Sequence, residues 1–390
     1  LLGCANMNAK IKNIIISFSF LGALLFLMVA SIIAPDIDIS NSERRTLLQL
    51  PELSWDAVVN KDIDGDRYFD NLEEYLLDQF VWRDGFRTIN SATRRYAFMQ
   101  KDVNDIFVLK GNIFSMYYQF NEKAVEQFAG VYNKVISRYF SKNGANIYYT
   151  IVPDKSYYAS EANGYLSIDY DKLYSTMQNK LSDHTYIEIR DLLDINDYYK
   201  TDLHWDQTKI IDVANKILAS MGNEGNVSLE DFEQKKFEGF EGSYYGQAAL
   251  PLKKDTLIYL TNEMLENCKV SYLDEGEFGK TGKVSFIDVP MYAEEKLGGV
   301  DSYDVFLWGA RSLIQIENPN CDNGKELVIF RDSFGSSLAP LLASEYSKIT
   351  ILDLRYVKSD FIGFITTFSD NCDVLFMYNS ALVNTPAVIF

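Results

Sequence analysis

The sequence is poor in histidine, cysteine and basic residues. Its two histidines, His184 and His204, are too few for a metal site built from several imidazoles. The four cysteines include no Cys-x-x-Cys pair, which argues against a disulfide framework. The 37 Lys and Arg residues are outnumbered by 55 Asp and Glu residues, which gives a net charge of −18. Nucleic-acid binding needs cations that neutralise phosphates, so no nucleic-acid partner is expected.

The rest of the composition is that of a globular protein. Hydrophobic residues make up 47% and charged residues 24% of 390 positions, which excludes a disordered or collagen-like chain. This length allows one large domain or two ordinary ones. Aromatic residues reach 14%, with 26 Tyr and 25 Phe. Such residues form sugar-binding surfaces as well as cores, and an aromatic core is the favoured explanation.

One long apolar run lies near the N-terminus. Residues 14–34 carry no charge, and as a helix they span about 30 Å, the hydrocarbon thickness of a bilayer. Lys10 and Lys12 precede the run, which favours an inside N-terminus and an extracytoplasmic remainder. We therefore expect residues 1–35 to form a single-pass anchor in the cell membrane.

A cleaved signal peptide is the alternative for this run. A cut after Ala34 would place Pro35 next to the cleavage site and Ile32 at the third position before it. Neither residue suits signal peptidase, and the run is long for the apolar part of a signal peptide. A retained anchor is therefore favoured.

The remaining chain divides by pattern into a stalk and an α/β domain. We expect the stalk at residues 36–65 and the domain at residues 66–390, with a β-rich insertion at about 222–318 that packs on the sheet. Apolar periodicity predicts helices at 67–100, 124–140, 171–181 and 206–221, and strands at 146–152, 186–189, 326–330, 348–354 and 373–378. The last three strands are nearly continuously apolar, as in a sheet covered on both faces.

The strongest chemical signal is a serine that follows one of these strands. Ser333 lies in a polar turn between the apolar strand at 326–330 and a helix expected from Ser336. A serine at the carboxyl edge of a strand faces the crevice of an open α/β sheet. The N–H groups at the start of the next helix would stabilise an oxyanion. An ordinary strand–helix turn, with Asp332 or Ser333 as a helix cap, gives the same pattern.

A second signal supplies the base that a serine nucleophile needs. Asp202 and His204 are two positions apart, and in an extended segment such residues point to the same side. The segment must then precede the helix that Asp206 is expected to cap. A carboxylate beside an imidazole fixes the tautomer of the base. A structural histidine is the plainer alternative, and a metal site at these three residues would lack further histidine ligands.

A third signal is the asparagine that ends another buried strand. Asn379 follows the apolar run at 373–378 and would place an amide donor beside the nucleophile. Asparagine is also common in turns, so a turn-forming role is the alternative.

Together these residues resemble the SGNH hydrolase superfamily, which combines a Gly-Asp-Ser-type strand end, a strand that ends in Asn, and an Asp–His pair. Here Arg331-Asp332-Ser333, Tyr378-Asn379 and Asp202-Leu203-His204 match these blocks. The Asp–His pair precedes the serine, whereas the standard order places it last. That permuted order is similar to the alginate O-acetyltransferases of the AlgX and AlgJ type. The segment 201–205 (TDLHW) most resembles the motif that names the bacterial DHHW family.

The resemblance to the DHHW family extends from about residue 40 to the C-terminus. Its other motifs are at 41–45 (NSERR), 78–83 (DQF and Arg83), 152–156 (VPDKS), 242–244 (GSY) and 353–356 (DLRY). Two positions depart from the pattern: Leu203 replaces the first His of the family motif, and Arg331 stands where the superfamily has Gly. The implied fold is flavodoxin-like, with a mostly parallel sheet, helices on both faces and a permuted motif order.

The resemblance also implies roles for individual residues. Ser333 would be the nucleophile, His204 the general base and then the acid, and Asp202 the residue that orients His204. The Ser333 N–H, with Asn379, would stabilise the oxyanion. The implied protein is an extracytoplasmic O-acetyltransferase or acetylesterase that acts on a cell-envelope polysaccharide.

Partners follow from the same resemblance. Arg355, Tyr356 and Tyr244 are expected to contact the glycan, and a membrane protein is expected to supply acetyl groups. The chemistry requires no cofactor and no metal. The alternative is a catalytically inactive glycan-binding or structural envelope protein with the same fold.

Overall fold

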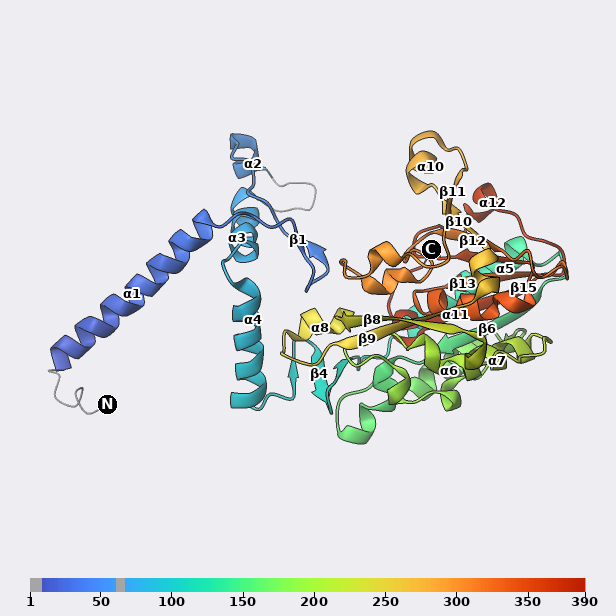
Figure 1. Ribbon diagram of the computed structural model, residues 1–390, viewed down its shortest axis with the longest axis horizontal. Coiled ribbons are helices and arrows are strands. Elements are labelled where there is room, and N and C mark those ends of the chain that lie inside the picture. The colour runs from blue at the N-terminus through green and yellow to red at the C-terminus, as the bar shows by residue number, and fades with distance from the viewer. Residues whose placement is uncertain (1–8, 61–66, 390) are drawn as a thin grey trace. The chain divides into compact units, whose positions relative to one another are not determined.

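The computed structural model describes residues 9–60 and 67–389 (Figure 1). The chain divides into two compact units, Leu1–Gln100 with Ala249–Pro251 and Lys101–Ala248 with Leu252–Phe390. The unit that contains the large sheet thus begins at Lys101, whereas the sequence predicted an α/β domain from residue 66. The helices before residue 100 make ion pairs with the N-terminal segment.

The N-terminal unit is mainly helical. Its elements are α1 (Ala9–Ile33), β1 (Ile39–Ser40), β2 (Arg45–Thr46), α2 (Trp55–Val59), α3 (Tyr68–Asp78), α4 (Arg83–Ala92) and a π-helical turn at Thr93–Ala97. In the described part of the chain, one helix, Lys10–Ile33, is long and apolar enough to cross a membrane, and it is not buried. Such a helix fits a membrane span or a signal sequence.

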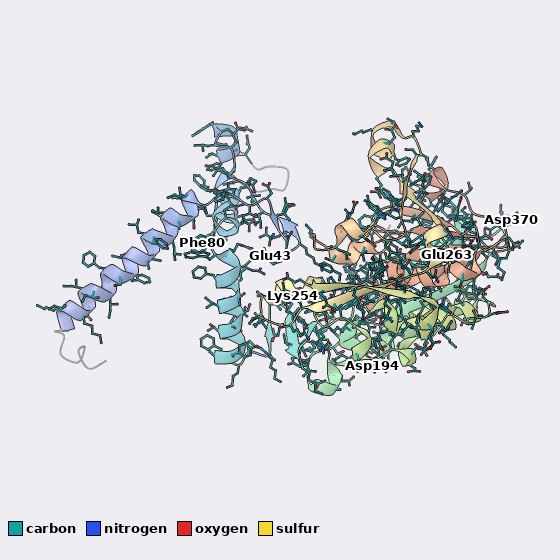
Figure 2. All side chains as sticks on the ribbon, viewed as in Figure 1. Glu43, Phe80, Asp194, Lys254, Glu263 and Asp370 are labelled. Atoms are coloured by element: carbon teal, nitrogen blue, oxygen red, sulfur yellow. The ribbon has the colours of Figure 1, made fainter. Side chains whose placement is uncertain are left out.

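The helix predicted at 67–100 is interrupted between α3 and α4. Trp82 adopts a left-handed conformation with φ 56°, and a left-handed residue cannot continue a right-handed helix. Beyond the break, Arg83 lies 2.5 Å and Arg87 lies 3.0 Å from the carboxylate of Glu43. Glu43 is labelled in Figure 2. Asp78 pairs with Arg45 at 2.5 Å. These ion pairs fasten the β1–β2 hairpin to α3 and α4.

The second unit is built on an eight-stranded sheet in the order β11-β10-β12-β14-β13-β15-β6-β7. Its strands are β6 (Asn146–Val152), β7 (Thr185–Tyr186), β10 (Lys269–Leu273), β11 (Phe286–Val289), β12 (Leu313–Glu317), β13 (Glu326–Arg331), β14 (Lys348–Leu352) and β15 (Asp373–Asn379). The strands from β14 to β7 are parallel, and β12, β10 and β11 extend the sheet in antiparallel fashion. The mostly parallel sheet is therefore confirmed.

The order of the parallel strands is a permuted flavodoxin-like order. Counted from β13, the strands β13, β14, β15, β6 and β7 lie in the order 2-1-3-4-5 across the sheet. In the chain, however, β6 and β7 come first. The strand order reverses between β13 and β15, and ligands of such sheets bind outside the carboxyl ends of the strands at this point.

Helices cover both faces of the sheet. Leu327 and Ile329 of β13 pack in one apolar core with α7 (Ile211–Ser220) and α11 (Phe334–Leu342). Val328 of the same strand packs in a second core with α5 (Glu122–Tyr139) and α6 (Tyr170–Lys180). This alternation explains why the parallel strands are continuously apolar.

The segment at 222–318 is β-rich as predicted, but only part of it lies outside the main sheet. Its strands β10, β11 and β12 join the central sheet. The hairpin of β8 (Glu233–Phe240) and β9 (Asp255–Thr261) is separate, and a third sheet contains β3 (Asp102–Val103), β4 (Ile106–Leu109) and β5 (Asn112–Ser115). The helices not yet named are α8 (Ser243–Ala248), α9 (Glu263–Asn267), α10 (Glu275–Thr281), α12 (Ile362–Ile365) and α13 (Ser380–Val383).

Candidate active site

Ser333 lies at the end of a buried strand. It follows β13 directly, is the N-cap residue of α11, and is partly exposed. Asp332 holds the turn, because its Oδ1 accepts the Phe334 N–H at 3.1 Å and its Oδ2 accepts the Asn379 N–H at 2.7 Å. Asp332 thus ties the carboxyl ends of β13 and β15 together and fixes Ser333 where the strand order reverses.

One backbone amide is available beside the Ser333 hydroxyl. The Phe334 and Gly335 N–H groups donate to Asp332, and the Ser336 N–H donates to the Ser333 carbonyl. Within residues 67–389, the Ser333 N–H has no such acceptor. An amide at the start of a helix favours negative charge, so this N–H is a suitable donor to an oxyanion.

Asp202 and His204 lie in a bend between Tyr198 and Trp205, which form an isolated β-bridge. The sequence predicted an extended segment here. Instead, Asp202 Oδ1 accepts the His204 N–H at 2.9 Å, and the bend brings the two side chains to the same side. The other carboxylate oxygen accepts the Ser243 N–H at 2.6 Å. Both oxygens of Asp202 therefore have fixed partners.

The structure brings the serine, the histidine and the aspartate into one chain of contacts. His204 Nε2 lies 2.7 Å from Ser333 Oγ, although the two residues are 129 positions apart. His204 Nδ1 lies 2.5 Å from Asp202 Oδ1. A carboxylate on Nδ1 holds the proton there and leaves Nε2 as the acceptor. Asp202 is fully buried and His204 is 4% exposed, so little water screens the contact.

Aromatic rings enclose the imidazole of His204. Tyr303 is stacked on it, with ring centroids 3.8 Å apart, and the Phe334 ring is tilted by 57° to it with centroids 4.9 Å apart. The Tyr303 hydroxyl and Trp205 Nε1 both donate to Ser337 Oγ at 2.8 Å. Tyr303 thus links the histidine to α11, which follows Ser333. Sequence reasoning missed Tyr303, because it lies in an irregular segment with no motif around it.

The sequence matches the DHHW protein family over residues 92–352. The chain belongs to the DHHW family. Its fold is similar to that of a DHHW family protein from Eubacterium siraeum DSM 15702, with 20% identity and a TM-score of 0.57 over 74% of this chain and 94% of that one. It is also similar to Bacillus cereus PatB1, solved with a sulfonyl adduct, with 18% identity and a TM-score of 0.58 over 71% and 95% of the two chains.

A further match is the O-acetyltransferase domain of Pseudomonas putida AlgJ, with 12% identity and a TM-score of 0.40 over 72% of this chain and 92% of that one. No curated protein matches the sequence. At these identities, the likeness to the E. siraeum protein and to PatB1 shows a shared fold.

The DHHW motif can be assigned position by position. Leu203, which replaces the first His, is partly buried and packs against the apolar core. Trp205 is fully buried and fixes the motif to Ser337. Asp206 accepts the N–H and hydroxyl of Thr208 and so caps a short 3-10 turn rather than the main helix, which starts at Ile211. Among the described residues, no cluster of three or more His, Cys, Asp and Glu side chains fits a metal ion.

Arg331 is the second position at which this chain departs from the expected pattern, and its side chain is fully buried. The aliphatic part of the Arg331 side chain fits because residue 335 is glycine: a Cβ there would lie 2.6 Å from Arg331 Cβ. Its Nη2 donates to the Gly309 carbonyl at 3.2 Å, and its Nη1 lies 3.6 Å from Asp353 Oδ2. Burial lowers the pKa of the guanidinium, and the attraction of Asp353 opposes this shift. In the described part of the chain, its Nε and Nη1 have no hydrogen-bond partner.

Asn379 lies beside the turn but uses its side chain locally. Its Oδ1 accepts the Ala381 N–H at 3.0 Å, which caps α13, and its Nδ2 donates to the Val152 carbonyl at 3.4 Å. Its backbone N–H holds Asp332. The oxyanion role of its side chain stays a prediction, and the contacts also fit the turn-forming role.

The three residues predicted to contact a glycan differ in exposure. Tyr356 is 55% exposed, and the Arg355 guanidinium lies 5.3 Å from its ring centroid. Arg355 also donates to both oxygens of Asp353, from Nε to Oδ1 at 3.0 Å and from Nη2 to Oδ2 at 2.6 Å. Tyr244 is 9% exposed and its N–H donates to the Thr201 carbonyl beside Asp202. Glycan contact by these residues stays a prediction.

Proposed function

We propose that this protein is a membrane-anchored, extracytoplasmic O-acetyltransferase or acetylesterase that acts on a cell-envelope polysaccharide through Ser333, His204 and Asp202. One observation carries the proposal: Ser333 Oγ lies 2.7 Å from His204 Nε2, while Asp202 holds the opposite ring nitrogen at 2.5 Å. A partly exposed hydroxyl, a base on that hydroxyl and a carboxylate on the base are the parts that acyl transfer requires.

In the first half-reaction, Ser333 Oγ attacks the carbonyl carbon of an acetyl ester while His204 Nε2 takes the hydroxyl proton. The carbonyl oxygen becomes an oxyanion, which the Ser333 N–H would stabilise. The intermediate collapses, the bond to the leaving oxygen breaks, and His204 returns the proton to that oxygen. The product is an acetyl ester on Ser333.

In the second half-reaction, a sugar hydroxyl or water attacks the acetyl-serine. His204 takes the proton of the attacking group and returns it to Ser333 Oγ as the acyl bond breaks. A sugar acceptor gives O-acetyl transfer, and water gives hydrolysis. The exposed ring of Tyr356 and the Arg355 guanidinium are offered as glycan contacts, because sugars stack on aromatic rings and bond to guanidinium groups.

The location proposed for the reaction rests on α1. An apolar helix with Lys10 and Lys12 before it favours a bilayer anchor with the remaining chain outside. An acetyl ester made in the cytoplasm would then have to cross the membrane, so a membrane protein is the proposed acyl donor.

The experiment compares the full chain in detergent micelles with its Ser333→Ala variant on a chromogenic acetyl ester. The wild type should release the chromophore, and the variant should lose at least about 100-fold in rate. Ser336→Ala is the matched control, since Ser336 lies on the same helix and its buried Oγ has no partner among the described residues. A sulfonyl fluoride should add one sulfonyl group to Ser333 and none to the variant.

Two results would contradict the proposal. Equal rates in wild type and Ser333→Ala would remove Ser333 from the mechanism. Absence of both turnover and sulfonyl labelling in the folded wild type would favour the inactive glycan-binding or structural alternative.

A further inference from the structure

A buried lysine contacts the loop that carries Asp202 and His204. Lys155 is 2% exposed. Its Nζ donates to the carbonyls of Ile113 at 3.0 Å, Tyr199 at 2.6 Å and Lys200 at 2.9 Å. An ammonium has three N–H groups, so each one has a carbonyl acceptor. Two of these carbonyls belong to the residues just before Thr201 and Asp202.

The main chain that carries Lys155 is itself fixed at the end of β6. Asp154 Oδ2 accepts hydrogen bonds from the hydroxyls of Tyr170 and Ser380, each at 2.7 Å, and Asp154 Oδ1 accepts the Ser156 N–H at 2.9 Å. Ser156 Oγ donates to the Ser115 carbonyl at 2.6 Å. These hydrogen bonds fix the motif at 152–156, which carries the Lys155 ammonium. They also connect the motif to Ser380, the residue after Asn379.

The charges that face Lys155 come from three places. Asp255 and Asp202 attract the ammonium, and Lys200 repels it. Asp255 also holds the same loop, because its Oδ2 accepts the N–H and the hydroxyl of Thr201, both at 2.7 Å. The ring of Phe114 lies under the ammonium, with its centroid 5.0 Å from Nζ.

We propose that Lys155, in its ammonium form, is the positioning residue that holds the 199–204 loop so that Asp202 and His204 face Ser333. This inference rests on the proposed function for its kinetic consequence, but its structural consequence is independent of turnover. Fixing two successive carbonyls sets the direction in which the chain leaves towards Asp202. A shift of about 1 Å in a reacting group is enough to lower a rate by about 100-fold.

If the ammonium of Lys155 holds the loop, the position of Asp202 and His204 depends on the charge of Lys155. A neutral amine has two N–H groups and one lone pair, so one of the three carbonyls would lose its donor and face that lone pair. Burial lowers the pKa of Lys155 to about 7, and the attraction of Asp255 and Asp202 opposes this shift. The loop should therefore be held in place at pH values below that pKa and should loosen as the pH rises above it.

The test uses the two histidines of the chain. The full protein, labelled with 15N-histidine and held in detergent micelles, should give a low-field Nδ1–H resonance from the His204–Asp202 contact, with His184 as an internal reference. The variants are Lys155→Met and Lys155→Arg. Lys172→Met is the matched control, because Lys172 is a surface lysine over the ring of Phe120.

Lys155→Met should lose the low-field resonance and reduce kcat about 100-fold with little change in KM, while Lys172→Met keeps both. In the wild type, resonance and kcat should decline together as the pH rises above about 7, and Lys155→Arg, which does not titrate, should lack this decline. A Lys155→Met protein with the wild-type resonance and kcat would overturn the inference.

The two proposals can fail separately. If the wild type has no esterase activity, the resonance still decides whether Lys155 positions His204. If Lys155→Met does not fold, the pH titration of the wild type and of Lys155→Arg decides the question. The titration runs from pH 6 to pH 9, about one unit or more either side of 7. A wild-type low-field resonance that is unchanged over this range would overturn the inference.

Discussion

The ring of Tyr303 lies flat on the imidazole of His204, with centroids 3.8 Å apart and planes 6° from parallel. The phenol is held in place by its bond to Ser337 Oγ at 2.8 Å. Burial raises the pKa of the Tyr303 phenol well above its usual value of 10, so the hydroxyl stays a neutral donor. The stack fixes the plane of the imidazole and presents an aromatic face to the imidazolium that the proposed mechanism would form.

Two substitutions of Tyr303 should distinguish the effect of its ring stack on kcat from the effect of its hydroxyl. Tyr303→Leu removes the ring face, and we expect kcat to fall by up to about tenfold, which corresponds to an aromatic contact of about 1.4 kcal/mol. Tyr303→Phe keeps the ring and removes the Ser337 bond, so its kcat should stay within about threefold of wild type. Steady-state kinetics on an acetyl ester measure both variants. Equal losses in Phe and Leu would show that the hydroxyl, not the ring, supports His204.

Gly242 leaves room for Asp202. A Cβ at this position would lie 2.4 Å from Asp202 Cβ and 2.4 Å from its backbone nitrogen. Gly242→Ala should therefore displace Asp202, reduce the activity more than tenfold and destabilise the fold by about 1–3 kcal/mol. Gly279→Ala is the matched control, because a Cβ there meets nothing within 4 Å. Urea unfolding and ester turnover check the pair, and an active, stable Gly242→Ala would contradict the close contact.

Much of the sheet was predictable because its strands are buried on both faces. The apolar run at 146–152 coincides with β6, and the runs around residues 328, 350 and 375 mark β13, β14 and β15. A continuous apolar pattern has few structural alternatives at that length. The turn that carries Ser333 was predictable for the same reason, since it follows a well-marked strand.

Other parts left too weak a signal in the sequence. Tyr303 and Gly242 contact the Asp–His pair across about 40 to 100 positions of chain, and no local pattern encodes such contacts. Only Val270 and Leu273 of strand β10 are buried, so its membership of the central sheet was not apparent. The left-handed conformation of Trp82 divides a helical pattern that continues on both sides of it. In each case tertiary contacts decide the local structure.

Asp78 makes the N-terminal unit sensitive to acid. The hydrogen bond from Arg45 lowers the pKa of Asp78 below 3.8; burial opposes the shift and the Leu48 N–H adds to it. A lowered carboxylate pKa gives stability that is fully present above the unfolded value of 3.8 and is lost as the pH falls through the folded value. Acid should therefore loosen the β1–β2 hairpin below about pH 3.8.

Asp78→Asn should reproduce that loss at neutral pH. We expect amide exchange in residues 67–100 to accelerate by roughly tenfold at pH 7, as for a lost charged hydrogen bond of about 1.4 kcal/mol. Glu73→Gln, an exposed carboxylate on the same helix, is the control. Exchange mass spectrometry on the full chain gives the comparison. The difference between Asp78→Asn and wild type should shrink at low pH, and a difference that grows would reverse the assigned sign.

Arg331 should be less important for stability than its burial suggests. Removing it leaves Asp353 paired with Arg355, whose Nη2 lies 2.6 Å from the carboxylate. It also removes a guanidinium whose Nε and Nη1 have no hydrogen-bond partner within the described residues. Arg331→Met, which fills similar space, should therefore cost less than about 2 kcal/mol. Asp353→Asn should cost about 3–5 kcal/mol, because it leaves two buried or partly buried cations without their shared anion.

Urea unfolding of the two variants tests this asymmetry, with near-ultraviolet circular dichroism reporting the aromatic core. A loss larger for Arg331→Met than for Asp353→Asn would show that the guanidinium, through the Gly309 carbonyl, supports the loop at 307–309 more than the charge pair does. That loop has three successive residues with positive φ, at 53°, 63° and 74°, so it depends on outside contacts to keep its shape. The expected order follows because Asp353, not Arg331, is the group that both neighbouring arginines share.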